Sequence, residues 1–299
     1  MSVLVVGSVA LDDIESPAGS VRGVLGGAAC YFALAASYFV PVSTVGVVGE
    51  DFPREHLEFL RSRGIDTSGI YTAQGRTFRW GGRYHASLNQ RDTLFTDLGV
   101  FEGFKPALDD AQRNASFVFL ANIHPALQLG VLEQVKKPVF SAMDTMNFWI
   151  ERTPAELRKT LERVQGLVIN DEEARQLSGE YNLLRAAAAI RRMGPRMVII
   201  KRGEHGALLF DDEGVFAAPA FPLEEVRDPT GAGDTFAGGF IGALARERYV
   251  GSETLRRAVV FGSTLASFCV EQFSVDRLRT LEMSEIYERY AKFRALTRF

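Results

Sequence analysis

The sequence predicts an α/β protein with a mostly parallel central sheet. Short apolar runs rich in β-branched residues alternate with segments whose apolar residues recur every three to four positions. The runs are VLVVG, STVGVV, FVFLA, PVFSAMD, GLVIN and MVIIKRG, and the helical segments between them include REHLEFLRSRG and LLRAAAAIRRMG. Strands of this kind are buried on both faces, and helical crossovers make neighbouring strands parallel. We therefore expect a layered α/β fold.

Residues 72–100 interrupt this alternation. Thr, Phe, Trp and Tyr alternate there with polar residues around Gly81, Gly82 and Asn89, a pattern typical of antiparallel hairpins. Residues 13–24 could add a strand to the same small sheet. We expect residues 1–299 to form one domain, from which this sheet projects as a lid.

Composition and charge favour a small-molecule partner. The formal net charge is −3, and the arginines are interspersed with acidic residues, which is typical of solvated helix faces and not of a nucleic-acid surface. No apolar run reaches membrane-spanning length, and the start SVLVVGSVALDD lacks the features of a secretory signal, so we expect a cytoplasmic protein with no membrane contact. Cys30 and Cys269 lie in apolar helical patterns and are expected in the core. The four histidines show no ligand spacing.

The run DPTGAGD, residues 228–234, carries the strongest chemical signal. A helix of small and apolar residues is expected to begin at about Ala232, so Gly231, Ala232 and Gly233 would present free N–H groups at its start. Such a turn can hold a phosphate. Asp234, in the same turn, could accept the proton of an attacking hydroxyl. By itself, the run is equally consistent with a polar turn that caps a helix.

The complete set of motifs resembles the ribokinase family, also called the PfkB family of carbohydrate kinases. The family pattern D-T-x-G-A-G-D is matched except that Pro229 replaces Thr. Further segments agree in order along nearly the whole chain: GSVALD ending at Asp12, the diglycine Gly26–Gly27, VGVVGEDFPREHLEFLRSRGIDT, NDEE from Asn170 to Glu173, and GEHG from Gly203 to Gly206. The resemblance implies a three-layer α/β/α fold with a small β lid, and ATP and Mg²⁺ as cofactors.

The resemblance also implies roles for individual residues. Asp234 would be the catalytic base, with Gly231, Ala232 and Gly233 as the anion hole. Asp12, Gly26 and Gly27 would bind the acceptor, and Glu173 would lie at the Mg²⁺ site. The nucleotide-binding set would comprise Asn170, Lys201, Gly203, Gly206, Thr230 and Gly262. Asp228, together with Thr230, matches positions that bind a monovalent cation such as K⁺ in some relatives. By itself, NDEE is also an ordinary acidic first turn of a helix.

Two departures from the sugar-kinase pattern bear on the acceptor. Tyr31 and Ala10 stand where many sugar kinases have Asn. A tyrosine can stack on a base as well as donate one hydrogen bond. In SAMDTMNFW the motif D-x-N-x-R is matched imperfectly, with Asn147 displaced by one position and no Arg, so Asn147 is expected as a weaker substrate contact.

These motifs predict an ATP-dependent kinase acting on a hydroxyl of a pentose or hexose, with a nucleoside as the alternative acceptor. Arg79, Trp80 and Tyr84 could close over the substrate or form an intersubunit surface, and a homodimer through the lid is expected. An NAD-dependent oxidoreductase is disfavoured because the first strand lacks G-x-G-x-x-G, and P-loop chemistry because no Walker A motif occurs. A non-catalytic sugar or nucleotide sensor would not need Asp234.

Overall fold

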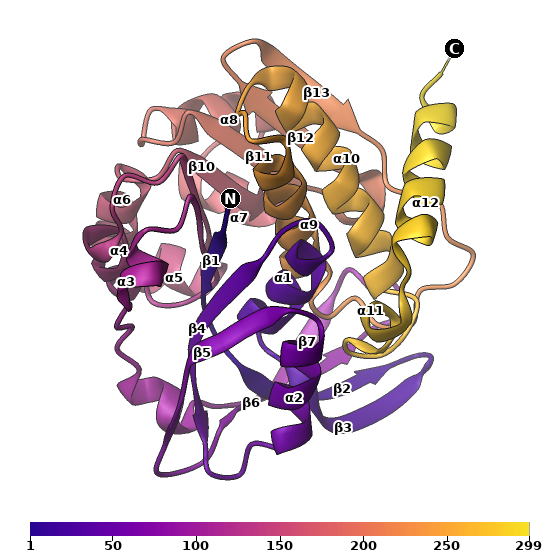
Figure 1. Cartoon of the computed structure of the whole chain (residues 1–299). Helices are drawn as coiled ribbons and strands as arrows, with labels where there is room; N and C mark the ends of the chain where they lie inside the picture. Colours follow the sequence, from indigo (N-terminus) through magenta and orange to yellow (C-terminus); the bar gives the residue numbers. More distant parts are fainter. Residues whose placement is uncertain (299) are drawn as a thin grey trace.

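The computed structural model describes residues 1–298 and has two sheets (Figure 1). Within those residues the large sheet has nine strands in the order β13-β12-β11-β10-β9-β8-β1-β4-β5. Their bounds are β1 (Val3–Val6), β4 (Val42–Gly49), β5 (Ile65–Ala73), β8 (Phe117–Leu120), β9 (Phe140–Asp144), β10 (Gly166–Asn170), β11 (Met197–Lys201), β12 (Ala207–Asp211) and β13 (Gly214–Ala218). The pairings from β5 through to β11 are parallel.

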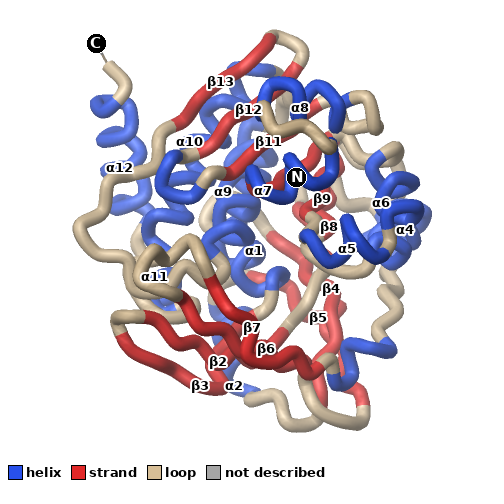
Figure 2. The backbone as a smooth tube through the Cα atoms, turned by 180° about the vertical axis from the view of Figure 1, so that it is seen from behind, coloured by secondary structure: helices blue, strands red, loops and turns tan. Residues whose placement is uncertain are grey.

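Helices cover both faces of the large sheet, as Figures 1 and 2 show. Along β1 the side chains of Val3 and Val5 join one hydrophobic core, and those of Leu4 and Val6 join the other. The first core is completed by α1 (Ala28–Ser37), α2 (Arg54–Ser62), α9 (Ala232–Glu247), α10 (Ser252–Cys269), α11 (Asp276–Thr280) and α12 (Met283–Leu296). The second is completed by α4 (Pro125–Gln134), α5 (Asn147–Arg152), α6 (Pro154–Leu161), α7 (Asp171–Ser178) and α8 (Leu183–Arg191). Two apolar faces explain why the strands show no polar alternation.

Small residues let α9 pack closely against its neighbouring helices. A Cβ at Gly238 would collide with the Phe32 carbonyl of α1, and a Cβ at Gly239 would approach Gly262 of α10 to 3.1 Å. Cys30 and Cys269 are fully buried in the same core, as expected. The tight helix packing holds the first turn of α9 in place against α1 and α10.

The small sheet consists of β2 (Ala10–Ser16), β3 (Gly19–Gly26), β6 (Phe78–Tyr84) and β7 (Arg91–Asp97), in the order β3-β2-β6-β7. It lies at one end of the large sheet, below α1 in Figure 2. β6 and β7 form the expected antiparallel hairpin, and β3 pairs antiparallel with β2. The pairing of β2 with β6 is parallel, which differs from an all-antiparallel lid. A parallel pair is possible because a long stretch of chain, containing β4 and β5, separates these two strands.

Several boundaries differ from the sequence predictions. Thr72 and Ala73, placed in the lid by the sequence pattern, are the last residues of β5. The antiparallel hairpin of β12 and β13 extends the edge of the large sheet and was not predicted. A short helix, α11, precedes α12 in addition to the helical segments expected after Val215. The connections also contain α3 (Asp110–Arg113) and the 3₁₀ turns η1 (Gly99–Gly103) and η2 (Gly203–His205).

Candidate active site at the carboxyl edge of the large sheet

Three neighbouring strands end in polar residues at the same edge of the large sheet. β9 ends in Asp144, β10 in Asn170 and β11 in Lys201. Because these strands are parallel and paired in register, with Asn170 opposite Lys201, their carboxyl ends lie side by side. This edge is where open α/β sheets place their ligands.

The first turn of α9 meets this edge. A Cβ on Gly233 would lie 2.8 Å from the Lys201 Nζ, so the ammonium group sits directly against the GAGD backbone. Gly231 is the N-cap residue with φ 73°, a left-handed conformation that favours glycine. The helix starts at Ala232, as the sequence predicted.

The N–H groups of this turn differ in availability. The Ala232 N–H donates to the Pro229 carbonyl at 3.2 Å, so it is not the free donor that we expected from the sequence. The Ala232 N–H is used in the tight turn in which Gly231 has a left-handed conformation. Within residues 1–298, no backbone carbonyl accepts the N–H groups of Gly233 and Asp234, although the Asp234 N–H also interacts with its own carboxylate. These two donors can bind an anion at the helix N-terminus.

Lys201 and Asp144 form an ion pair, Nζ to Oδ2 at 3.5 Å, with both side chains largely buried. Asp144 Oδ1 also accepts the N–H of Thr145 at 2.8 Å. Burial nevertheless raises the pKa of Asp144, because Lys201 only partly offsets the loss of water. This ion pair was not predicted from the sequence, because it depends on the order of the strands in the sheet.

The carboxylates around the ion pair have raised pKa values. Burial, and then the negative charge of Asp144, raise the pKa of Asp234 to about 7, while Lys201 and Arg91 oppose the shift. The same two causes raise the pKa of Glu173 to about 7. A carboxylate with a pKa near neutrality is suited to accept and release a proton.

Asn170 and Glu173 are joined by a capping box at the start of α7. The Glu173 N–H donates to the Asn170 Oδ1 at 2.8 Å, and the Asn170 N–H donates to the Glu173 Oε2 at 3.1 Å. The helix-capping interpretation of NDEE is therefore correct as far as these atoms go. Within residues 1–298, the Asn170 amide nitrogen and the Glu173 Oε1 take no part in this capping box and can bind other partners.

Asp12 is enclosed by the diglycine. Its side chain lies where a Cβ on Gly26 would be, and it accepts a hydrogen bond from the Gly27 N–H. Its exposed fraction is only 4%. Burial, then the charges of Asp228, Asp234 and Asp13, raise the pKa of Asp12 to about 8. This acid and the diglycine thus belong to one compact unit, at the junction of β2 and β3 with α1.

Tyr31 lies beneath Gly231. It is 1% exposed, and a Cβ on Gly231 would collide with its ring. An enclosed ring has no free face, so the structure gives no support to the stacking on a base that the sequence suggested. Its hydroxyl is buried and has no hydrogen-bond partner among the described residues, so it could bond to a ligand.

Other residues predicted from the sequence are placed as follows. Gly203 and Gly206 bound η2, and the Gly206 N–H donates to the Gly203 carbonyl at 3.1 Å. Gly262 is buried in the contact between α10 and α9, where a Cβ would approach the Phe236 carbonyl to 2.7 Å. Helix packing therefore accounts for this glycine, and contact with adenine stays a prediction. Asn147 begins α5 and is exposed.

Asp228 ties two loops together, and its role at a monovalent-cation site stays a prediction. It is fully buried; Oδ1 accepts the Thr230 N–H and Oδ2 the Ser274 N–H, both at 2.8 Å. For Mg²⁺, no group of three or more His, Cys, Asp or Glu side chains in residues 1–298 forms a cage. Mg²⁺ commonly binds through one or two carboxylates plus substrate phosphates, and Glu173 fits that mode.

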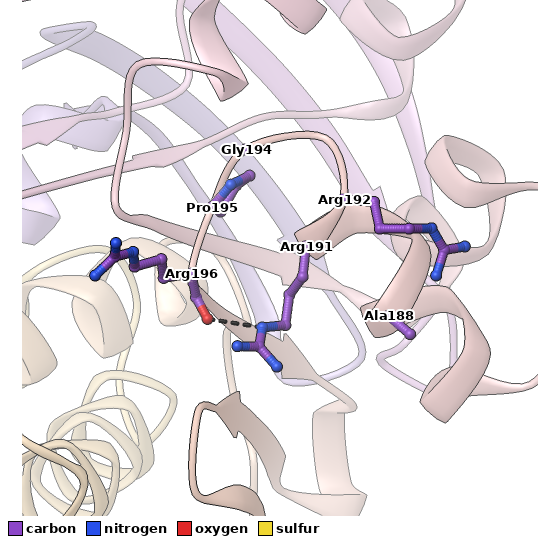
Figure 3. Close-up of a pocket in the computed structure, with 6 residues that line it drawn as sticks. All are labelled: Ala188, Arg191, Arg192, Gly194, Pro195 and Arg196. Atoms are coloured by element: carbon purple, nitrogen blue, oxygen red, sulfur yellow. Dashed lines mark hydrogen bonds between the residues drawn. The ribbon is translucent and has the colours of Figure 1, made fainter.

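A cavity of about 330 Å³, whose lining residues are drawn in Figure 3, lies at the amino ends of the strands of the large sheet. Three arginines contribute to its lining, and Arg191 is held by the Arg196 carbonyl at 2.8 Å and by Asp212. It lies between the end of α8 and the beginning of β11. This cavity is separate from the candidate active site. Among the described helices, none has the length and apolar character needed to cross a membrane.

The fold and the site define a class of phosphotransferases. The sequence model of the pfkB family carbohydrate kinases matches residues 2–280, and the chain belongs to this family. It is a kinase that phosphorylates an alcohol group, as the motifs predicted, and the oxidoreductase hypothesis is set aside.

Two curated relatives and one solved structure are similar to this chain over most of its length. A cytidine kinase of Thermococcus kodakarensis is 31% identical over 83% of this chain and 90% of its own length. A nucleoside kinase of Methanothermobacter thermautotrophicus is 30% identical over 87% of this chain and 84% of its own length. The fold matches that of an E. coli protein assigned to ribokinase II and bound to ATP and Mg²⁺, with a TM-score of 0.80, 20% identity, and coverage of 97% and 99%.

Proposed function

We propose that the protein transfers the γ-phosphoryl group of ATP to a primary hydroxyl of a nucleoside, with Asp234 as the general base. One observation carries this proposal. The Asp234 carboxylate, the N–H groups at the start of α9 and the Lys201 ammonium all lie at the first turn of this helix. A base and an anion-binding group side by side suit in-line phosphoryl transfer.

The proposed reaction assigns each group one task. Asp234 accepts the proton as the acceptor oxygen bonds to the γ-phosphorus, and the bond from that phosphorus to the bridging oxygen of ADP breaks. Lys201 and the N–H groups of the α9 turn stabilise the negative charge on the transferred group. Asp12 binds acceptor hydroxyls, and Glu173 lies where phosphate-bound Mg²⁺ would be held. The metal, when bound, offsets phosphate charge.

The acceptor class rests on the relatives. The sequence placed a pentose or hexose first and a nucleoside second, whereas the two curated relatives above act on nucleosides by name. We therefore give the nucleoside precedence. A potassium ion at Asp228 and Thr230 is left out of the proposed reaction; each carboxylate oxygen of Asp228 accepts one N–H group and keeps a lone pair that could bind a cation.

A coupled assay of ADP release tests this function. The panel would contain cytidine, uridine, adenosine, inosine, ribose and fructose, each with Mg²⁺ and ATP. We expect the highest kcat/KM with a ribonucleoside. A preference for a free sugar over every nucleoside would overturn the acceptor class and leave the role of Asp234 standing. The Asp234→Asn variant, assayed in parallel, reports any contaminating kinase.

Two further expectations accompany this proposal. An enzyme that uses ATP is expected in the cytoplasm. A homodimer through the small sheet is supported by β7, its edge strand, where Leu94 and Phe95 are 43% and 39% exposed. Light scattering should then give twice the mass of the chain, and replacement of Leu94 by Lys should shift the mass toward the monomer.

A further inference from the structure

Tyr84 is the last residue of β6, and its side chain faces the body of the protein. Neighbouring residues of a strand point to opposite faces of the sheet. Arg83 is exposed and pairs with Glu15, whereas Tyr84 is only 7% exposed. The sequence offered two roles for Tyr84, closure over the substrate and contact with another subunit. A side chain buried to this extent leaves almost no surface for another subunit.

The hydroxyl of Tyr84 is hydrogen-bonded to the hydroxyl of Thr230 in the DPTGAGD run, with 3.1 Å between the two oxygens. Thr230 is 8% exposed, so both hydroxyls lie away from bulk water, where an unpaired polar group is costly. Thr230 immediately precedes Gly231, the N-cap residue of α9. The small sheet is therefore bonded to the residue at which the α9 turn begins.

Three hydrogen bonds donated by backbone N–H groups fix the shape of this turn. They run from the N–H groups of Thr230, Ala232 and Thr235 to the Asp228 Oδ1, the Pro229 carbonyl and the Gly231 carbonyl, at 2.8, 3.2 and 2.8 Å. Each bond joins residues that are close in the sequence. These bonds set the conformation of the turn, and contacts with distant parts of the chain must set its place in the site.

Two tyrosines supply contacts of this second kind. The ring of Tyr31, from α1, lies beneath Gly231, and Tyr84 bonds to Thr230 from the small sheet. Donors that stabilise a transition state must point at the developing charge before it forms. A misplacement of about 1 Å can lower a rate by about 100-fold. The bond from Tyr84 thus bears directly on where the N–H groups of the α9 turn point.

We propose that Tyr84 is a positioning residue for phosphoryl transfer, because its hydrogen bond to Thr230 holds the first turn of α9 in the orientation that stabilises the transition state. This inference rests on the proposed kinase reaction at Asp234. In this role Tyr84 acts through Thr230 and touches no reacting atom. Since Tyr84 belongs to the small sheet, the bond forms only while that sheet lies against the DPTGAGD run.

Hydrogen exchange tests the positioning directly and needs no acceptor. Tyr84→Phe removes only the hydroxyl. The hydrogen-bonded amides of this turn should exchange about 10-fold faster in the variant, as measured by mass spectrometry on peptides that cover residues 228–236. The matched control is Tyr38→Phe, because the Tyr38 hydroxyl donates to the Leu278 carbonyl at 2.7 Å, in a contact between the end of α1 and α11. Exchange in residues 228–236 should be unchanged in this control.

Steady-state kinetics with the best acceptor provide the second measurement. Tyr84→Phe should lower kcat by about 10-fold, the effect expected of one neutral hydrogen bond, and leave KM for ATP and for the acceptor within about 2-fold. Thr230→Val removes the same bond from its other end. Because the two residues act through one contact, the double variant should have a kcat no lower than that of the weaker single variant. Tyr38→Phe should keep the kcat of the wild type.

Several results would overturn this role. Equal exchange rates of residues 228–236 in Tyr84→Phe and Tyr38→Phe would do so, and so would faster exchange without a fall in kcat. A raised KM for the acceptor at unchanged kcat would assign Tyr84 to acceptor binding. Losses of kcat that multiply in the double variant would show that Tyr84 does not act through Thr230. If no acceptor were found, the kinase proposal would fail, whereas the exchange comparison would still decide whether Tyr84 holds the turn.

Discussion

The Nζ of Lys201 lies 3.5 Å from the Oδ2 of Asp144, and this ion pair connects two strand ends that β10 separates. Lys201 is also the group against which the Gly233 backbone rests. One ammonium thus has a structural partner and a position beside the proposed phosphate site. The two roles can be separated by mutation.

Replacing Lys201 with Met should reduce stability by about 2–3 kcal/mol at pH 8, because it leaves the Asp144 carboxylate buried without its counter-charge. Chemical denaturation measures this loss. The loss should shrink at pH 5.5, where the uncompensated Asp144 can take up a proton. The double variant Lys201→Met, Asp144→Asn should regain most of the stability and none of the activity. If activity returned with stability, Lys201 would be a structural residue only.

Asp234→Asn should retain ATP binding within a few-fold and lower kcat by about 10²–10⁴-fold, because the amide cannot accept the proton. Steady-state kinetics and titration of ATP measure the two effects. Asp110→Asn is the control, since Asp110 is an exposed first-turn aspartate of α3, near the other edge of the sheet. Turnover near that of the wild type would refute the proposed base.

Activity should depend on pH through the same carboxylate. With a pKa of about 7, Asp234 is protonated and inactive below neutrality, so kcat/KM should fall as the pH drops through about 7. The positive charge of Lys201 lowers this pKa, so the acidic limb of the pH–rate profile should move to higher pH in Lys201→Met. Measuring kcat/KM against pH for both proteins tests the direction of this shift. If the acidic limb stayed at the same pH, the titrating group would not be Asp234.

The stability of the ligand-free protein should decrease as the pH rises from about 5 to about 8.5. The folded pKa of Asp12 is raised to about 8, so the folded state holds a proton that the unfolded chain has lost. The contribution of the Asp12 proton to the free energy of unfolding is therefore greatest in acid and is lost as the pH rises through the folded pKa. Asp12→Asn should flatten this part of the Tm–pH curve and raise Tm at pH 8.5 by a few degrees. A steeper curve in the variant would contradict the buried-acid explanation.

The sequence predicted the parts of the site that are contiguous in the chain. The start of α9 at Ala232 and the polar ends of the strands follow from local periodicity and glycine placement, and the family pattern placed Asp234 among them. Core positions such as Cys30 and Cys269 were also predicted correctly, because an apolar helical pattern indicates burial whatever the neighbours are.

Features that depend on tertiary packing were not predictable. The position of Tyr31 under Gly231 depends on how α1 meets α9, and no local pattern encodes that contact. The sequence shows Arg91 only as one charged residue in an alternating hairpin pattern. Its position opposite Tyr84 follows from the register of β6 and β7. The parallel pairing of β2 and β6 likewise joins strands that are distant in the sequence.

Gly231 should be far less tolerant of alanine than Gly179, although both have φ 73°. At Gly179 a Cβ would meet nothing within 4 Å, so Gly179→Ala should cost only the left-handed strain of about 1–2 kcal/mol. At Gly231 the Cβ would also strike the buried Tyr31 ring, which cannot move aside in a close-packed core. Overpacking of this kind costs a further 1–3 kcal/mol, roughly. Urea denaturation of both variants measures the difference, and equal losses would show that the contact between Gly231 and Tyr31 is looser than the structure indicates.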